Sequence, residues 1–169
     1  MGIEIERKFL LNDDSWRAGV ARSQRMVQGY LVGAAMVVSG HSKSSVRVRI
    51  GGEQAWLNIK SSTLGVERQE FEYAIPVADA QRMLDTLCGG VVDKVRHYVP
   101  VEGHEFEVDE FLGENAGLIV AELELVHADA AYPRPTWLGA EVSAQARYYN
   151  LNLIDHPYAR WNAAEKAGH

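Results

Sequence analysis

The stretch GIEIERKFLL, residues 2–11, alternates charged and apolar side chains near the start of the chain. Successive side chains of a β-strand point to opposite faces, so this pattern predicts a strand with Glu4, Glu6 and Lys8 on one face. Two carboxylates and an ammonium then stand in a row. Whether that row faces solvent or lines a site decides how the fold is read.

The same alternation recurs along the chain and predicts eight strands with few helices. Turn signals rich in Gly and Ser predict a hairpin loop at 33–44, and loops or turns at 51–54 and 61–67. Helices are expected at 13–23 and 77–90, and in the tail from about Trp137. Strands after the first are expected at 25–32, 45–50, 55–61, 68–76, 91–100, 104–111 and 117–126. This arrangement is typical of an antiparallel meander that closes into a barrel.

Sorting the strand residues by face collects seven cations and nine carboxylates on one face, and apolar side chains on the other. Half-solvated strands commonly carry such ion pairs outside, and periodicity alone does not say which face is inside. The pairs VRVR and KVR place like cations on neighbouring positions, whereas IEIE, EFE and AELE place like carboxylates there. Neighbouring cations repel each other unless an anion lies between them, and neighbouring carboxylates repel each other unless a divalent cation lies between them. A polyphosphate with bound Mg²⁺ meets both demands.

Composition narrows the class of protein. The chain has 169 residues, 47% of them hydrophobic, which suits a single domain over residues 1–169. Its 17 Lys and Arg against 23 Asp and Glu give a net charge of −6, which argues against nucleic acid as a partner. Cys88 is the only cysteine, which fits a reducing compartment. The first charged residue is Glu4, so no secretory signal is visible, and no apolar run reaches the length of about 20 residues that a membrane span needs. We therefore expect a cytoplasmic protein without a membrane partner.

An ordered series of motifs resembles the CYTH superfamily, the triphosphate tunnel metalloenzymes. IEIERKFLL carries the Glu-x-Glu-x-Lys signature that opens these proteins, and the resemblance extends over nearly the whole chain. The insertion at 33–44 is longer than the family pattern suggests. The further motifs are QGYL (28–31), VRVRI (46–50), WLNIK (56–60), ERQEFEYAIP (67–76), KVRHYV (94–99), EVDEF (107–111), AELEL (121–125) and WLGAEVSAQARYYNLNL (137–153).

The resemblance implies a mainly β (α+β) fold, an eight-stranded antiparallel β-barrel tunnel with a charged interior and helices packed outside. It implies Mg²⁺ or Mn²⁺, with two ions per site when substrate is bound. Lys94, Glu4 and Glu6 are expected to act in catalysis. The residues that resemble phosphate ligands are Lys8, Arg47, Arg49, Lys60, Lys94, Arg96 and Tyr30. Those that resemble metal ligands are Glu4, Glu6, Glu122, Glu124, Asp109, Glu70 and Glu72.

Three functions stay open at this point. The first is hydrolysis of inorganic tripolyphosphate, a small-molecule substrate. The second is a different enzyme on the same scaffold, a class IV adenylate cyclase or a thiamine triphosphatase. The third is a non-catalytic polyphosphate-binding module, for which nine facing carboxylates have little use. A homodimer is compatible with each.

Several residues carry two interpretations. Tyr30 either contacts a phosphate or packs within its strand. Arg147, Tyr148 and Asn150 belong to a tail motif that either plugs one end of the tunnel, the interpretation we favour, or touches substrate. The six histidines show no ligand spacing, which argues against a zinc site.

Overall fold

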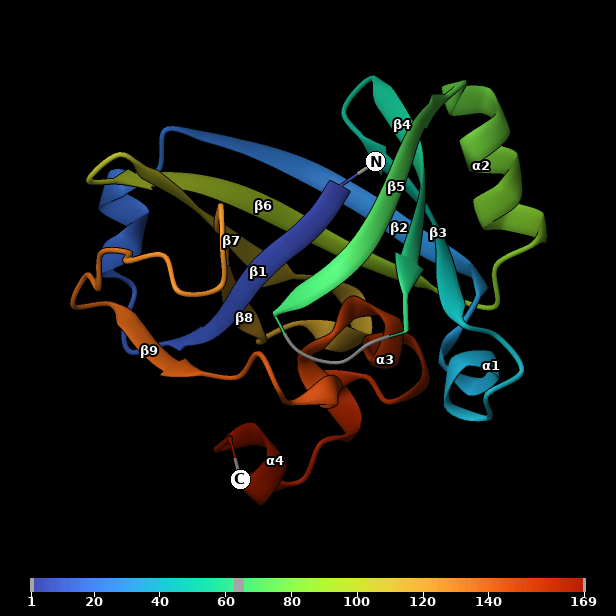
Figure 1. Cartoon of the computed structure of the whole chain (residues 1–169). Coiled ribbons are helices and arrows are strands. Elements are labelled where there is room, and N and C mark those ends of the chain that lie inside the picture. Colours follow the sequence, from blue (N-terminus) through green and yellow to red (C-terminus); the bar gives the residue numbers. More distant parts are fainter. Residues whose placement is uncertain (1, 63–65, 169) are drawn as a thin grey trace.

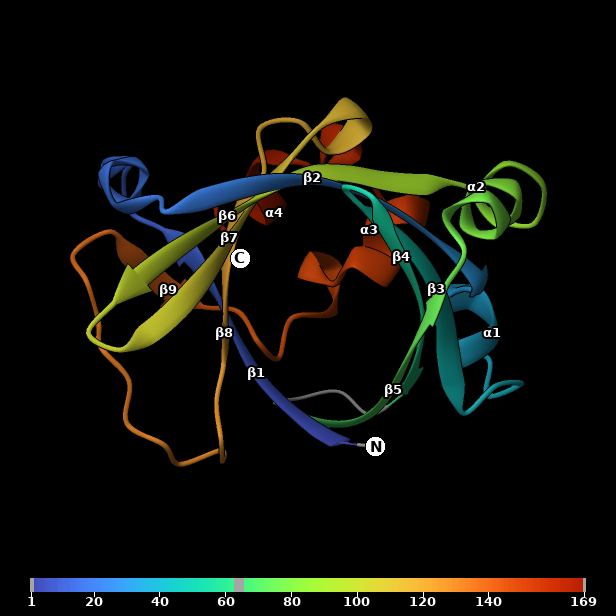
Figure 2. The same ribbon diagram turned by 90° about the horizontal axis from the view of Figure 1, so that it is seen from above.

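The computed structural model describes residues 2–62 and 66–168, and across these ranges nine strands form one antiparallel sheet. The strand order is β5-β4-β3-β2-β6-β7-β8-β1-β9, and β5 also pairs with β1, which closes the sheet on itself (Figures 1 and 2). The bounds are β1 Gly2–Leu11, β2 Arg22–Val32, β3 Ser44–Gly51, β4 Gln54–Ser61, β5 Glu67–Ile75, β6 Val91–Val101, β7 His104–Phe111, β8 Ile119–Glu124 and β9 Leu138–Glu141.

Strand β1 closes the barrel because it is shared between its neighbours. Gly2 to Ile5 pair with β5, whereas Glu6 to Phe9 pair with β8. The short β9 pairs with the end of β1, at Phe9 and Leu11. The predicted eight-stranded antiparallel barrel is therefore confirmed, with β9 as a ninth, short addition.

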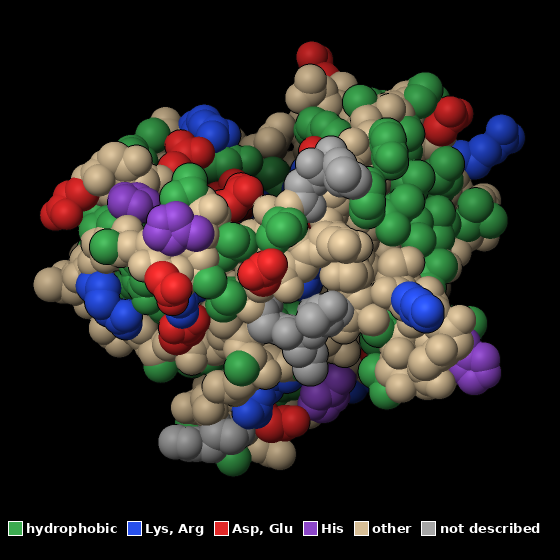
Figure 3. All heavy atoms as spheres, in the orientation of Figure 1, with side chains coloured by type: hydrophobic (Ala, Val, Ile, Leu, Met, Phe, Trp, Pro, Cys, Tyr) green, Lys and Arg blue, Asp and Glu red, His purple; other side chains and the backbone are tan. Residues whose placement is uncertain are grey.

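The apolar strand faces point outward and are covered there. Helix α2, Val77–Thr86, packs Ala80 and Leu84 against Val48 and Ala55 of the β3–β4 hairpin. On the opposite side, Trp16 of the 3-10 turn η1, Ser15–Gly19, belongs to a second cluster with apolar residues of β1, β6, β7 and β8. Figure 3 shows hydrophobic side chains gathered on the right of the molecule, over β5 and α2. Burying these outer faces leaves the barrel interior to the charged residues.

The C-terminal segment closes one end of the barrel. Leu10, Val92, Phe111 and Val120 occupy inward positions at that end, and they pack with Leu153 of the tail. Figure 2, which looks along the barrel, shows α3 across the far end of the ring. The helical elements of this part are η2 Gly113–Asn115, η3 Ala146–Tyr148, α3 Asn150–Asp155, η4 Tyr158–Arg160 and α4 Ala163–Lys166.

Two predicted segments in the first third of the chain are wrong in detail. The helix predicted at 13–23 shrinks to η1, because β2 begins at Arg22 and pairs with β6 from that residue on. The hairpin loop predicted at 33–44 contains the one-turn helix α1, Ala34–Val38, whose small and aliphatic residues follow directly on β2. Of the loop predicted at 61–67, residues 63–65 lie outside the described residues.

The predictions for the second half also need correction. Helix α2 ends at Thr86 with Leu87 as its C-cap, so Cys88 follows the helix instead of lying on it. The tail begins with β9 and not with a helix, since Leu138 and Glu141 pair with β1. Its helices then pack into one end of the barrel, which agrees with a tail that plugs the tunnel, whereas α2 packs on the outside.

Candidate functional site

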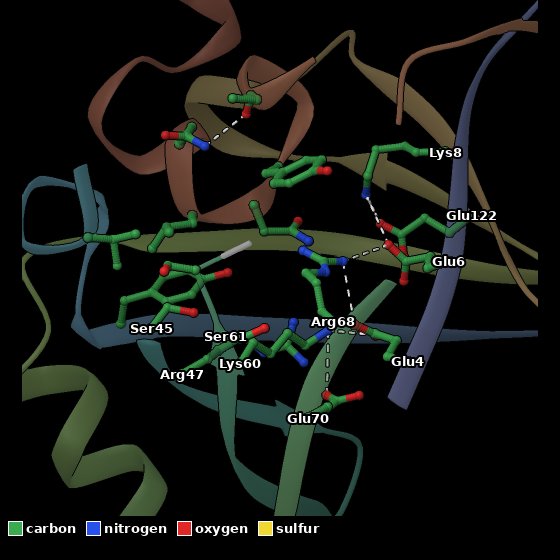
Figure 4. A pocket seen from close by; sticks show the side chains of 18 of the residues that line it. Glu4, Glu6, Lys8, Ser45, Arg47, Lys60, Ser61, Arg68, Glu70 and Glu122 are labelled. Atoms are coloured by element: carbon green, nitrogen blue, oxygen red, sulfur yellow. Dashed lines mark hydrogen bonds and ion pairs between the residues drawn. The ribbon is translucent and has the colours of Figure 1, made fainter. Parts of the chain in front are cut away.

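A cavity of about 750 Å³ lies inside the barrel. Side chains from the eight strands β1 to β8 line it. Most of these side chains come from alternate positions of their strands, as the strand period requires. Figure 4 shows several of these side chains converging from β1, β4 and β5. The charged residues on the cavity are Glu4, Glu6, Lys8, Arg47, Arg49, Lys60, Arg68, Glu70, Glu72, Lys94, Arg96, Glu107, Glu122 and Glu124.

One side of the cavity is lined by Lys8, Lys94, Arg96 and Glu122, and Asp109 lies behind them. We call these five residues the paired wall. Arg96 donates from Nε and Nη2 to the two oxygens of Asp109, both at 2.7 Å, and from Nη2 to Glu122 at 2.6 Å. Lys94 also bonds Asp109, and Lys8 bonds the second oxygen of Glu122. All five residues are at most 8% exposed. Their charges alternate along a single hydrogen-bonded chain.

Burial and neighbouring charges shift the pKa values of this wall in opposite directions. Burial lowers the pKa of Lys94 to about 8, with Arg96 acting in the same direction and Asp109 opposing it. Burial alone would raise the pKa of Glu122, but Lys8 and Arg96 hold it well below its usual range. Lys94 is therefore an ammonium that can release its proton near neutral pH, beside carboxylates that stay ionised.

The facing side, which we call the open wall, consists of Arg47 and Arg49 of β3, Lys60 of β4 and Arg68 of β5. The Nε atoms of all three arginines are buried and have no hydrogen-bond partner in the described part of the chain. The arginines here form longer ion pairs than Arg96 does: Arg49 lies 3.1 Å from Glu72, and Arg68 lies 3.4 Å from Glu4. Lys60 is closely paired, at 2.7 Å from Glu4. Guanidinium donors that are held in place without partners are suited to bind the oxygens of an anion.

Four carboxylates, those of Glu4, Glu6, Glu70 and Glu124, gather beside the open wall (Figure 4 labels the first three). Burial raises the pKa of Glu124, and the charges of the other three raise it further. Among the residues that the structure describes, the buried Oε2 atom of Glu4 has no hydrogen-bond partner. Such mutual repulsion is relieved when a divalent cation binds, and Mg²⁺ and Mn²⁺ prefer oxygen ligands of this kind. The donor set therefore fits the expected metal.

A complete metal cage is not preformed. Within the residues that the structure describes, no three His, Cys, Asp or Glu side chains are close enough together to hold an ion. Mg²⁺ commonly binds through one or two carboxylates together with water and substrate phosphates, so a partial site of this kind is compatible with it.

The structure brings nearly all of the predicted site residues to the cavity. Tyr30 lines it as well, and burial raises the pKa of its hydroxyl. Asp109 is the exception, because it lies behind Lys94 and Arg96 with no exposed surface. Ion pairs around Lys60 join Glu4 at 2.7 Å and Glu70 at 3.5 Å.

Sequence reasoning missed several functional candidates. Arg68 lines the cavity but is absent from the predicted phosphate ligands, although it lies two residues before Glu70 on the same charged strand face. Asn58 is fully buried and donates to both Glu70, at 3.0 Å, and Glu72. Only its position between Trp56 and Lys60 on the same strand could have pointed to it.

The tail both plugs and lines the tunnel. Tyr148 is buried in the apolar plug, which agrees with the interpretation that we favoured for it. Asn150 lines the cavity and lies 3.4 Å from the Nζ atom of Lys94. The ring of Tyr149 lies 5.1 Å from the Arg68 guanidinium and 5.7 Å from the Lys8 ammonium. Arg147 instead contacts Gln145 and the Tyr148 ring.

Helices long and apolar enough to cross a membrane do not occur in the described part of the chain. Residues 2–158 match the CYTH domain family. A protein of Acetivibrio thermocellus named "Inorganic triphosphatase" is 40% identical over 159 residues, 94% of this chain and 97% of that protein. A Nitrosomonas europaea protein of the same name is 32% identical over 153 residues, 89% of this chain and 95% of that protein. A crystal structure described as the inorganic triphosphatase NE1496 superimposes with a TM-score of 0.64 at 30% identity, covering 91% of this chain and 95% of the other.

Proposed function

The chain belongs to the CYTH domain family, and we propose that it is a metal-dependent inorganic triphosphatase. Water and tripolyphosphate react inside the barrel and leave as phosphate and pyrophosphate. The names of two relatives that match the chain over most of their lengths support this activity. They also favour tripolyphosphate over the nucleotide and thiamine substrates that the sequence left open.

The observation that carries the proposal is the open wall. Arg47, Arg49 and Arg68 keep buried Nε donors without partners in the described residues, around a cavity of about 750 Å³. A polyanion supplies the acceptors that these donors lack. Lys8, Lys60 and Arg96 add further positive charge, and Tyr30 adds a hydroxyl. A pure binding module would use these cations, but it would gain nothing from the carboxylates beside them.

Glu4, Glu6 and Glu124 are the residues that would hold Mg²⁺ or Mn²⁺, with Glu70, Glu72 and Glu122 as further oxygen donors on the cavity. When bound, one ion offsets the charge of the triphosphate and a second lowers the pKa of a water molecule. Glu4 and Glu6 lie on neighbouring inward positions of β1, so both orient toward the same part of the cavity. Lys60 of β4 pairs with Glu4 at 2.7 Å, and Arg68 of the neighbouring strand β5 lies 3.5 Å from Glu6, so these cations offset part of the negative charge.

Lys94 is the residue that we assign to proton transfer. The Nζ atom is buried, and its pKa of about 8 allows it to exist in both protonation states near neutral pH. In the hydrolysis, a bond forms between the water oxygen and the terminal phosphorus, and the bridging P–O bond breaks. The proton that the water loses is accepted at Lys94 when the amine is neutral. Positioning by the arginines supplies most of the remaining stabilisation, as in phosphoryl transfer generally.

The test is a phosphate-release assay with tripolyphosphate, ATP and thiamine triphosphate, each with Mg²⁺, with Mn²⁺ and with EDTA. We expect the highest kcat/KM on tripolyphosphate and no turnover in EDTA. Cyclic AMP formed from ATP without hydrolysis of tripolyphosphate would establish a cyclase instead. Tight binding of tripolyphosphate without turnover under any metal would establish a binding module. The cytoplasmic location and the homodimer expected from the sequence stay predictions.

A further inference from the structure

Asp109 occupies a different environment from every other carboxylate in the predicted metal set. It has no exposed surface and does not line the cavity, whereas Glu122, its neighbour on the paired wall, does. Its Oδ1 atom accepts from the Nε of Arg96 at 2.7 Å. Its Oδ2 atom accepts from the Nη2 of Arg96, also at 2.7 Å, and from the Nζ of Lys94.

These contacts leave little capacity for an ion. A carboxylate offers about four lone-pair sites, and three of those on Asp109 are used by two cations of the chain itself. A metal could bind Asp109 only if Lys94 or Arg96 first moved away, into a cavity that already holds like charges. By contrast, Glu4 lines the cavity and keeps a buried oxygen that accepts no hydrogen bond from the described part of the chain.

The two cations that Asp109 holds are the two that β6 presents to the cavity. Arg96 is bound by a planar, two-point contact, which restricts the orientation of its guanidinium. Beyond Asp109, the Nζ atom of Lys94 donates only to Asn150, at 3.4 Å, among the hydrogen bonds of the described residues. Without Asp109, the flexible lysine side chain would lose its short charged contact, whereas Arg96 would keep Glu107 and Glu122.

We propose that Asp109 is a positioning residue for the hydrolysis, which fixes Lys94 and Arg96 from behind, and that it is not a metal ligand. This inference rests on the proposed function for its kinetic consequences. Misplacing a catalytic group by about 1 Å can cost about 10²-fold in rate. Removing a negative charge next to an anion site also strengthens the attraction for that anion. Removing the Asp109 carboxylate should therefore lower kcat, whereas KM for tripolyphosphate should stay the same or decrease.

The experiment compares Asp109→Asn, which keeps the shape of the side chain, with Glu110→Gln on the same strand. Glu110 faces outward and pairs with Arg17 at 3.0 Å, so it is a matched carboxylate outside the cavity. We expect kcat of Asp109→Asn to fall about 10²-fold with KM equal or lower, and with the Mg²⁺ concentration at half-maximal rate unchanged. Glu110→Gln is expected to match the wild type in all three values.

A double-mutant cycle separates positioning from other roles. Because Asp109 acts through Lys94, Asp109→Asn should slow a Lys94→Met enzyme at least tenfold less than it slows the wild type. The double variant removes a buried cation together with its partner. If Asp109→Asn alone fails to fold, the rate of the double variant is compared with that of Lys94→Met, and the two rates should differ less than tenfold.

Three results would overturn the proposal. A Mg²⁺ requirement raised tenfold or more, with activity restored at high Mg²⁺, would make Asp109 a metal ligand. Normal kcat in a folded Asp109→Asn protein would make it a purely structural residue, as would fully additive losses in the cycle. If the wild type binds tripolyphosphate in EDTA by calorimetry but never hydrolyses it, the proposed function fails. In that case calorimetry with Mg²⁺ tests the remaining part of the inference: a Mg²⁺ dissociation constant raised tenfold or more in Asp109→Asn would make Asp109 a metal ligand and overturn it.

Discussion

The two walls of the tunnel carry similar charged residues but differ in how closely these residues are paired with one another. On the paired wall, Arg96 meets Asp109 and Glu122 at 2.6 to 2.7 Å, and its side chain is 8% exposed. On the open wall, Arg68 meets Glu4 and Glu6 at 3.4 to 3.5 Å, and the Nε of Arg47 has no hydrogen-bond partner in the described residues. Each cation of the first wall has a close carboxylate partner, whereas the arginines of the second keep buried Nε donors without a hydrogen bond in the described part of the chain.

This difference separates stability from binding. A buried ion pair costs desolvation, and removing one partner leaves an uncompensated charge, so the paired wall should govern folding. On the open wall Arg47 and Arg49 repel each other, and arginines whose Nε donors lack hydrogen bonds in the described residues gain from a bound polyanion, so this wall should govern affinity and rate. Each prediction below tests one side of this contrast.

The largest effect is expected for Arg96→Met on the paired wall. The change leaves Asp109, Glu107 and Glu122 without their shared cation, which should lower the free energy of unfolding by about 3–5 kcal/mol. The matched change on the open wall, Arg47→Met, should cost about 1 kcal/mol or less, since no buried carboxylate loses a hydrogen bond. Urea unfolding in EDTA measures both, and equal losses would remove the distinction between the walls.

The second prediction concerns Glu124→Gln, beside the open wall. Turnover should fall by at least about 10²-fold, or about 2.7 kcal/mol of transition-state stabilisation, because one metal ligand is lost. In EDTA the variant should be as stable as the wild type or more so, because Glu124 is repelled by Glu4, Glu6 and Glu70. Added Mg²⁺ should raise the Tm of the wild type more than that of the variant. Near-normal turnover in a folded variant would contradict the metal assignment.

A third prediction concerns Arg49 on the open wall. Arg49→Ala should lower kcat/KM for tripolyphosphate about tenfold or more, since one charged contact to the polyanion disappears. The Tm in EDTA should change little. Wild-type kinetics would mean that this side chain serves only its pairing with Glu72, at 3.1 Å.

The pH dependence of the reaction tests Lys94 on the paired wall. With a pKa of about 8, the neutral amine rises about fivefold between pH 7 and pH 8. If the neutral form accepts the proton, kcat/KM should rise through this range and level off above it. Lys94→Arg should remove the rise, because a guanidinium stays protonated there. An unchanged profile in that variant would exclude Lys94 as the acceptor.

The smallest effect is expected outside the barrel. Arg25 and Asp93 form an ion pair across β2 and β6 with side chains 67% and 25% exposed. Water screens such a pair, so Asp93→Asn should change stability by about 0.5 kcal/mol or less and leave kcat/KM unaltered. A loss comparable to that of Arg96→Met would mean that burial is not what distinguishes the paired wall.

Much of this fold could be predicted from alternation alone. Runs such as VRVRI and AELEL predict strands because the side-chain period of two is local, and each strand of the barrel was anticipated to within a few residues. The short elements were not. Segment 34–38 forms one helical turn and 138–141 forms β9, and both depend on where β2 and β1 place the neighbouring chain.

The site likewise has features that the local sequence pattern predicts and features that depend on tertiary structure. The sequence determined which charged residues share a face, from Glu4 to Glu124, because strand parity is a property of the backbone. It also pointed to the family, through motifs that keep their order along the chain. Parity does not decide which face is enclosed, and only closure of β1 against both β5 and β8 turned the charged face inward.

Tertiary structure alone decided which of those charges are satisfied. Lys94 and Arg49 are alike in sequence context, each one of a pair of cations on a strand, but one is held by a buried aspartate and the other by a partly exposed glutamate. Asp109 and Glu107 sit two residues apart on one face, yet only Glu107 reaches the cavity. Pairing across strands depends on register and on the plug at the tunnel's end. Both arise from contacts between residues far apart in the chain, which a local pattern does not encode.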